Sequence, residues 1–266
     1  MPADSPGRCG RLRGVSPEAW LFDLDGVLTD TARVHAGAWK ETFDAALARR
    51  APGGGAPVEP FDLASDYERF VDGKPRYDGV RDFLAGRGIS LPEGTPADPP
   101  ELETVCGVGN AKNRLVLRRL GVPGAVVAFP GSLAFVEALR RAGVPVAVVS
   151  ASENCVAVLR SAGLAGLFDV VVDGLVASLR NLAGKPSPDT FLWAAGTLGV
   201  LPERVAVVED ALAGVRAARA GGFGLVVGVA RSVPAAALAE AGADVVVGDL
   251  AELLSPVASS PAGAPG

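Results

Sequence analysis

Six short apolar runs recur along the chain, separated by longer segments with the composition of helices. Runs that carry almost no polar residue are typical of strands buried on both faces of a parallel sheet. The pattern therefore predicts an α/β fold with a Rossmann-like, doubly wound parallel sheet core. The expected strands are 19–23, 144–150, 170–172, 205–209, 224–229 and 244–247.

The alternation of strands and helices is interrupted between the first and second strands. The segments there have helical propensity, namely 31–50, 66–86 and 101–120, and they are separated by loops rich in Pro and Gly at 52–57 and 92–100. We therefore predict an inserted α-helical cap domain. The expected boundaries are 15–31 and 129–254 for the core and 32–128 for the cap, with disordered ends at 1–14 and 255–266.

Two carboxylates lie where the first strand meets a glycine turn. Asp23 falls at the carboxyl end of the strand, the edge at which open α/β sheets bind ligands. Alternate residues of an extended chain share a face, so Asp25 addresses the same small volume, and Gly26 lets the chain turn away. The structural alternative is a helix cap beside a turn. Because crowded carboxylates repel each other unless a cation or a proton intervenes, the pair indicates a chemical site.

Polar residues also mark other strand ends. Ser150 follows the second strand, and two acids, Glu209 and Asp210, end the fourth. Lys185 lies just ahead of a helix between them. Taken singly, none of these residues indicates a functional site, because hydroxyls at strand ends, solvated lysines and acidic residues at helix starts are common. Their joint occurrence at one edge of a sheet favours a shared active site.

The string FDLDGVLTD at 22–30 resembles the first motif of the haloacid dehalogenase superfamily of phosphotransferases. Ser150, Lys185 and the two acids of the fourth strand match its remaining motifs, in the same order. The resemblance implies that Asp23 is a nucleophile that becomes an aspartyl phosphate and that Asp25 is the general acid/base. It also implies a cap inserted after the first strand.

Phosphoryl transfer to a carboxylate brings two anions together, so a divalent cation is required between them. Mg²⁺ prefers hard oxygen ligands and keeps several waters. The expected ligands are Asp23, Asp210 and the backbone carbonyl of Asp25, with Glu209 reaching the ion through water. Lys185 would add a second positive charge, and Ser150 a hydrogen bond to a phosphoryl oxygen.

The cap carries a narrower resemblance. Thr31, His35 and Trp39 form one stripe of the first cap helix. A solvated histidine and a tryptophan in the cap core are the ordinary explanations of the last two. The strings DTARVHAGAWK at 30–40, DGKPR at 72–76 and KN at 112–113 nevertheless resemble the β-phosphoglucomutase-like family.

This narrower resemblance implies a substrate site. His35 would hydrogen-bond Asp25, and Arg76 would hold the phosphate that is not reacting, for which an arginine fork is well suited. The implied substrate-binding residues are His35, Trp39, Gly73, Arg76, Lys112, Asn113, Ala151, Ser152 and Asn154. Glu153 departs from the pattern, because a basic residue is common there in the family.

The resemblance implies interconversion of β-glucose 1-phosphate and glucose 6-phosphate through an aspartyl phosphate and a sugar bisphosphate. The alternative is a Mg²⁺-dependent sugar-phosphate phosphatase, which uses the same four motifs. A phosphorylated receiver domain shares the chemistry, but it would be about half as long and would lack the insert.

Composition narrows the class of partner. The 266 residues carry a net charge of −5 without a basic block, which disfavours nucleic acid. No apolar run is long enough to span a bilayer, and the first residues lack the apolar core of a signal peptide. The three cysteines are scattered and read as reduced thiols. We therefore predict a monomeric, cytoplasmic enzyme that acts on a small-molecule sugar phosphate.

Overall fold

The computed structural model describes residues 16–49, 59–120, 122 and 126–254, and it confirms the predicted fold class. Six parallel strands form one sheet in the order β3-β2-β1-β4-β5-β6. Their bounds are β1 Ala19–Phe22, β2 Val146–Val149, β3 Val170–Val172, β4 Val205–Glu209, β5 Leu225–Val229 and β6 Val245–Val247. β1 lies between β2 and β4, so the first strand of the chain occupies the middle of the sheet.

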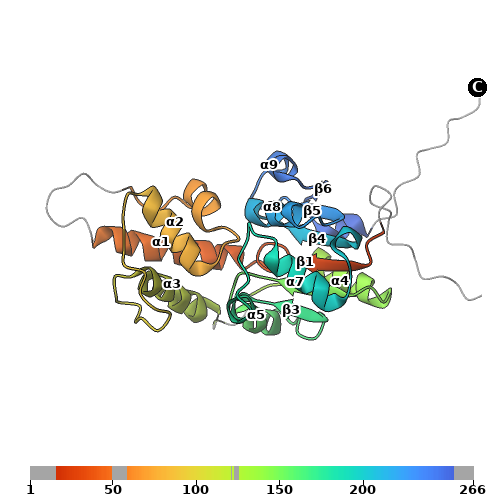
Figure 1. Ribbon diagram of the computed structural model, residues 1–266, viewed down its shortest axis with the longest axis horizontal. Coiled ribbons are helices and arrows are strands. Elements are labelled where there is room, and N and C mark those ends of the chain that lie inside the picture. The colour runs from red at the N-terminus through yellow and green to blue at the C-terminus, as the bar shows by residue number, and fades with distance from the viewer. Residues whose placement is uncertain (1–15, 50–58, 121, 123–125, 255–266) are drawn as a thin grey trace, which may run out of the picture.

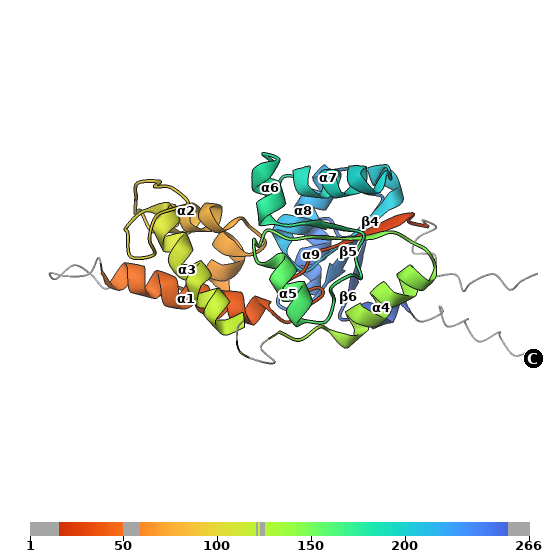
Figure 2. The same cartoon turned by 90° about the horizontal axis from the view of Figure 1, so that it is seen from below.

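Helices cover both faces of this sheet (Figures 1 and 2). Phe22 points to one face and packs edge-on against Phe135, with ring centroids 6.2 Å apart. Leu21 points to the other face and belongs to the same cluster as Phe191. Because each strand is buried on both sides, it reads as a continuous apolar run. The core helices are α4 Pro130–Arg141, α5 Cys155–Ser161, α6 Gly174–Leu179, α7 Asp189–Leu198, α8 Leu212–Ala220 and α9 Ala235–Ala241, with 3₁₀ turns η2 Pro202–Arg204 and η3 Leu250–Leu253.

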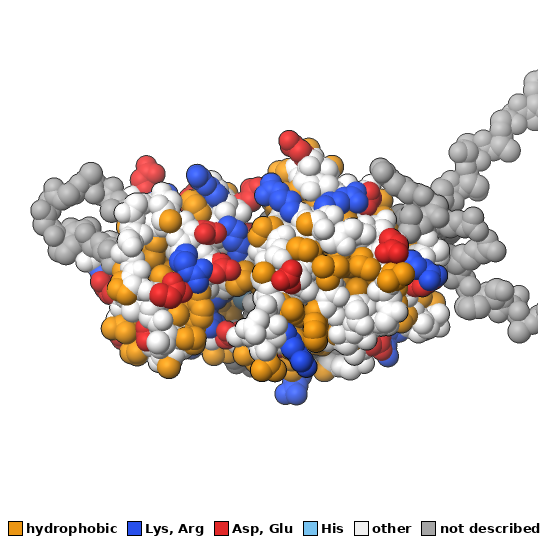
Figure 3. Space-filling model, in the orientation of Figure 1, with side chains coloured by type: hydrophobic (Ala, Val, Ile, Leu, Met, Phe, Trp, Pro, Cys, Tyr) orange, Lys and Arg blue, Asp and Glu red, His pale blue; other side chains and the backbone are white. Residues whose placement is uncertain are grey.

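The insert between β1 and β2 is helical, as predicted, and forms a second lobe (Figures 1 and 2). Its elements are α1 Ala32–Ala48, the π-helical turn η1 Tyr67–Val71, α2 Arg76–Gly86 and α3 Val105–Leu120. This cap has its own aromatic core, in which Phe43 lies 4.0 Å from Phe83 and 5.2 Å from Phe61 between ring centroids. The surface is hollowed where the lobes meet (Figure 3).

The helix expected over 66–86 is interrupted, so that part of the prediction is wrong. The residues at 72–75 leave helical geometry, because Gly73 adopts a left-handed φ of +67° and Pro75 is extended, with ψ of 143°. The resulting loop reaches the core. A Cβ at Gly184 would lie 2.1 Å from Cγ of Pro75, so only glycine permits this approach of cap to core.

Some predictions lie outside what the structure describes. The expected disorder at 1–14 and 255–266 and the linker at 52–57 fall on such residues. The cap and core boundaries, 32–128 and 129–254, stay predictions. Among the described residues, no helix combines the length and the apolar character needed to cross a bilayer.

Candidate active site

The predicted core residues meet at the carboxyl ends of three adjacent strands. Asp23 follows β1, Ser150 follows β2, and Glu209 ends β4. The backbone N–H of Asp23 donates to the carbonyl of Val208 at 3.0 Å, which extends the pairing of β1 with β4 up to Asp23. Parallel pairing therefore brings together side chains that are far apart in the sequence.

Asp23, Glu209 and Asp210 form a buried acidic cluster. One carboxylate oxygen from each lies within 4.8 Å of the other two. Burial, reinforced by neighbouring carboxylates, raises the pKa of Asp210 well above its usual value. A Cβ at Gly26 would lie 1.8 Å from an oxygen of Asp210, so glycine is required at this turn for packing as well as for its φ of +84°. Hard oxygen donors at this spacing fit a divalent cation, which would relieve their repulsion.

Lys185 lies among these acids. Its ammonium donates to Oδ1 of Asp23 and to Oε1 of Glu209, each at 2.5 Å, and to a backbone carbonyl of β2 at 3.2 Å. Burial alone would lower the pKa of Lys185, but the charges of the two carboxylates raise it above its usual value. The amine is therefore a permanent buried cation beside Asp23. Both oxygens of Glu209 are engaged, since Oε2 accepts the backbone N–H of Asp210 at 3.1 Å.

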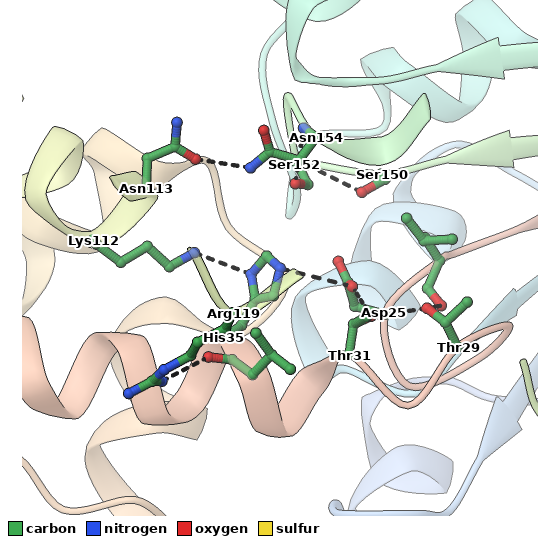
Figure 4. Close-up of polar contacts among 12 residues, drawn as sticks. Asp25, Thr29, Thr31, His35, Lys112, Asn113, Arg119, Ser150, Ser152 and Asn154 are labelled. Carbon is green, nitrogen blue, oxygen red and sulfur yellow. Dashed lines mark hydrogen bonds and ion pairs between the residues drawn. The ribbon is translucent and has the colours of Figure 1, made fainter. Parts of the chain in front are cut away.

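Asp25 lies on the loop that leads into the cap. The hydroxyl of Thr31, the residue that precedes α1, donates to Oδ1 of Asp25, and it lies 2.8 Å from the hydroxyl of Thr29 (Figure 4). Burial raises the pKa of Asp25, and a raised pKa is what a carboxyl group needs to deliver a proton near neutral pH. The start of the cap therefore contacts the expected acid/base directly.

His35 lies between Lys112 and Asp25 (Figure 4). Nζ of Lys112 is 3.0 Å from Nδ1 of His35, while Nε2 on the other side of the ring faces Oδ1 of Asp25. Burial, and then the charge of Lys112, hold the pKa of His35 well below its usual value. Nε2 is 3.9 Å from Asp25 and has no hydrogen-bond partner among the described residues. At this distance the expected His35–Asp25 hydrogen bond is not formed.

A cavity of about 360 Å³ separates cap and core above these residues. The predicted residues that line it are Asp23, Asp25, His35, Trp39, Gly73, Arg76, Lys112, Asn113, Ser150, Ala151, Ser152, Asn154 and Lys185. Trp39 is only 3% exposed and stacks on Phe43 with centroids 4.9 Å apart, so most of its ring belongs to the cap core. Lys112 lies 4.8 Å from the centre of the same ring.

Two polar contacts join cap and core across the cavity. The amide of Asn154 donates to Oδ1 of Asn113 at 2.8 Å (Figure 4), and the guanidinium of Arg76 donates to both carboxylate oxygens of Glu153, each at 3.1 Å. Asn113 and Asn154, both expected to bind the substrate, are thus bound to each other, whereas Arg76 is bound to Glu153, which was not expected there.

A profile of haloacid dehalogenase-like hydrolases matches residues 17–222, which is more than half of the chain. The protein belongs to the haloacid dehalogenase-like hydrolase family. It is 54% identical to a β-phosphoglucomutase of Mycobacterium tuberculosis over 239 residues, 89% of this chain and 91% of the relative. It is 31% identical to a phosphorylated carbohydrates phosphatase of Thermotoga maritima over 235 residues, 86% of this chain and 94% of that one. A hydrolase structure from Pseudomonas syringae superposes with a TM-score of 0.72, covering 89% and 95% of the two chains at 24% identity, which bears on the fold alone.

Three residues of this haloacid dehalogenase-like site were not predicted from the sequence as functional. Asp72 lines the cavity from the interrupted helix, and burial, followed by the charges of Glu209 and Asp23, raises its pKa to about 7. Tyr77 and Glu153 flank Arg76. Asp72 lies in the string at 72–76 that resembles the family, and Glu153 departs from the family pattern.

Metal binding should stabilise this haloacid dehalogenase-like protein more at pH 8 than at pH 5.5. The raised pKa values of Glu209, to about 7, and of Asp210 mean that the metal-free protein gains stability from protonated acids at low pH and loses it as pH rises through these values. A divalent cation would bind the ionised acids, so its stabilising effect should grow over the same pH range and approach about 2.7 kcal/mol at 100 times the dissociation constant.

Thermal unfolding with Mg²⁺ or a chelator at the two pH values measures this effect. The stabilisation by the metal should shrink in Asp210→Asn and persist in Glu101→Gln, which alters an exposed acid of the cap outside the cluster. An equal increment at both pH values would contradict the prediction.

Proposed function

We propose that this protein is a β-phosphoglucomutase that interconverts β-glucose 1-phosphate and glucose 6-phosphate. The observation that carries the proposal is a cavity lined by two sets of polar residues, Asp23, Lys185 and Ser150 in one and Arg76 and Asn154 in the other. We assign the first set to the reacting end and the second set to the distal end of a bound sugar bisphosphate. A sugar bisphosphate needs both ends, because one phosphate reacts while the other is held. The 54% identity to a mycobacterial β-phosphoglucomutase supports the same reaction.

In the first half-reaction, a carboxylate oxygen of Asp23 attacks the phosphorus of the sugar bisphosphate or of the phosphate donor. An O–P bond forms to Asp23 while the bond to the sugar oxygen breaks, and Asp25 gives its proton to the leaving oxygen. Lys185 stabilises the phosphoryl oxygens and orients Asp23. A divalent cation bound by Asp23 and Asp210 would neutralise charge between the two anions.

In the second half-reaction, Asp25 takes the proton of the other sugar hydroxyl, and that oxygen accepts the phosphoryl group from Asp23. Thr31 holds Asp25 in place, and Nε2 of His35 faces the same carboxylate at 3.9 Å. Closure of the cap excludes water, which would otherwise hydrolyse the aspartyl phosphate. The proposal includes Mg²⁺ as the cation, a monomeric state and a cytoplasmic location.

A sugar-phosphate phosphatase is the second candidate, and the 31% identity to the Thermotoga enzyme favours it. Both activities use the same phosphorylated aspartate. They differ in whether water or a sugar hydroxyl receives the phosphoryl group. This depends on whether Arg76 and Asn154, at the distal end of the cavity, hold the second phosphate.

The deciding assay offers β-glucose 1-phosphate with Mg²⁺ and a catalytic amount of the bisphosphate, and it follows glucose 6-phosphate and free phosphate together. We expect glucose 6-phosphate in large excess. Arg76→Ala should lose isomerisation by roughly 10- to 150-fold, since a charge-assisted clamp worth about 1.5 to 3 kcal/mol is removed.

Arg114→Ala is the matched control, because Arg114 is also a cap arginine paired with a carboxylate, Glu101, but is exposed and away from the cavity. It should behave as wild type. If more free phosphate than glucose 6-phosphate forms, or if Arg76→Ala isomerises normally, the protein is a phosphatase rather than a mutase.

A further inference from the structure

The carboxylate of Glu153 binds Arg76 at the distal end of the cavity, where a substrate phosphate is expected to bind. It lies on the loop after β2, between Ser152 and Asn154, and its carboxylate reaches across to Arg76 on the cap. The side chain of Arg76 is 13% exposed and that of Glu153 is 36% exposed, so the ion pair lies at the rim of the cavity rather than inside the core. The carboxylate thus presents to Arg76 the same kind of oxygen anion that a phosphate would.

Arg76 is held in a fixed orientation independently of Glu153. Its guanidinium lies 4.8 Å from the centre of the Tyr77 ring, and Nη2 donates to the Tyr77 hydroxyl at 3.2 Å. That hydroxyl in turn donates to Oδ1 of Asn110 at 2.9 Å, which anchors it to α3. The arginine is therefore preorganised for an anion whether or not Glu153 is present.

The contact with Glu153 uses the arginine incompletely. Nη2 alone serves both carboxylate oxygens, whereas the strong arrangement is a fork in which two nitrogens donate in parallel. The Nε atom of Arg76 is buried and has no hydrogen-bond partner among the described residues. A buried donor without a partner is costly, so an anion that engages Nε and Nη2 together would be preferred over Glu153.

We propose that Glu153 sets the anion selectivity of the distal end: its carboxylate occupies Arg76 and must be displaced by the phosphate of the sugar substrate. This inference rests on the proposed function, in which Arg76 holds the unreacted phosphate. A sugar bisphosphate is held at both ends of the cavity and displaces Glu153. Free orthophosphate is held at one end only, so it competes with Glu153 poorly. Glu153 therefore protects the distal end from abundant small anions.

The test is a titration of orthophosphate into the Mg²⁺-loaded full-length protein by calorimetry, in wild type, Glu153→Gln, Arg76→Ala and the double variant. Orthophosphate can also bind beside Lys185, so the site compared is the one that Arg76→Ala removes. Glu153→Gln keeps the shape and removes the competing charge, so we expect the dissociation constant to fall roughly threefold to tenfold, in line with a partly exposed ion pair. When Arg76 is already replaced by Ala, Glu153→Gln should change the dissociation constant of orthophosphate by less than about twofold. The carboxylate then has no arginine for which to compete, so the effects of the two substitutions are not additive.

The matched control is Glu137→Gln, which removes the same charge from an exposed pair with Arg141 on α4. Its phosphate affinity should equal that of wild type. Glu153→Ala should reproduce the direction seen with Glu153→Gln, and thermal unfolding checks that both variants fold.

Unchanged or weaker phosphate binding in the Glu153 variants would overturn the inference, as would a tightening that persists in full without Arg76. Failure of the proposed function is distinguishable, because the titration needs no turnover. A protein that hydrolyses β-glucose 1-phosphate would overturn the mutase reaction and still report whether Glu153 competes for Arg76.

Discussion

Asp23→Asn is expected to lower turnover of a sugar phosphate by at least about 10³-fold, as removal of a nucleophile does in other enzymes with covalent intermediates. The amide has nearly the shape of the carboxylate, but it lacks the charge that attacks phosphorus. Chelation of the divalent cation should inactivate the wild type to a similar degree. Turnover with β-glucose 1-phosphate and intact-mass analysis for a phosphoryl adduct measure both effects.

The fold should survive this substitution. Lys185 keeps its ion pair with Glu209 and its bond to a backbone carbonyl when Asp23 becomes an amide. Thermal unfolding separates loss of chemistry from loss of structure. Near-normal turnover in Asp23→Asn, or a phosphoryl adduct on another residue, would end the covalent mechanism.

Asp25→Ala is expected to lose activity on sugar phosphates by about 10²- to 10⁴-fold, which is the usual contribution of general acid/base catalysis. It should still accept a phosphoryl group from an aryl phosphate, because a good leaving group departs without a proton. The raised pKa of Asp25, caused by burial, and its contact with Thr31 support this role. Steady-state rates with both donors test it.

Asp25→Asn provides the matched comparison, since the amide oxygen can still accept from Thr31 while the side chain can no longer transfer a proton. Both variants should show the same selective loss. If aryl phosphate and sugar phosphate suffer equally, Asp25 acts only in structure or in metal binding.

Local patterns in the sequence predicted the order of strands and helices and the cluster of catalytic residues at the strand ends. Continuous apolar runs identify parallel strands, and polar residues at their ends identify the functional edge, because the alternation of strand and helix leaves few ways to assemble such a sheet. The acidic cluster of Asp23, Glu209 and Asp210 follows from this rule. The helical character of the insert was likewise local, since it depends on propensity within each segment.

The interruption of the helix over 66–86 also has a local cause, because Gly73 and Pro75 both disfavour a continuous helix. The contact of Pro75 with Gly184, which places the loop at 72–75 against the core, was decided only by the tertiary structure. This break is what brings Asp72 into the cavity, a placement that no periodic pattern indicates.

The polar contacts between cap and core were decided only by the tertiary structure. The sequence by itself determined that Asp23, Asp25 and Lys185 belong to one site and that Arg76 lies in the cap. The contact of Thr31 with Asp25 is local, whereas only the packing of cap on core decided that Nε2 of His35 lies 3.9 Å from Asp25 and that Glu153 binds Arg76. The reason is physical: hydrogen bonds act over about 3 Å, so the choice between competing partners depends on how the cap lies against the core, which no local pattern encodes.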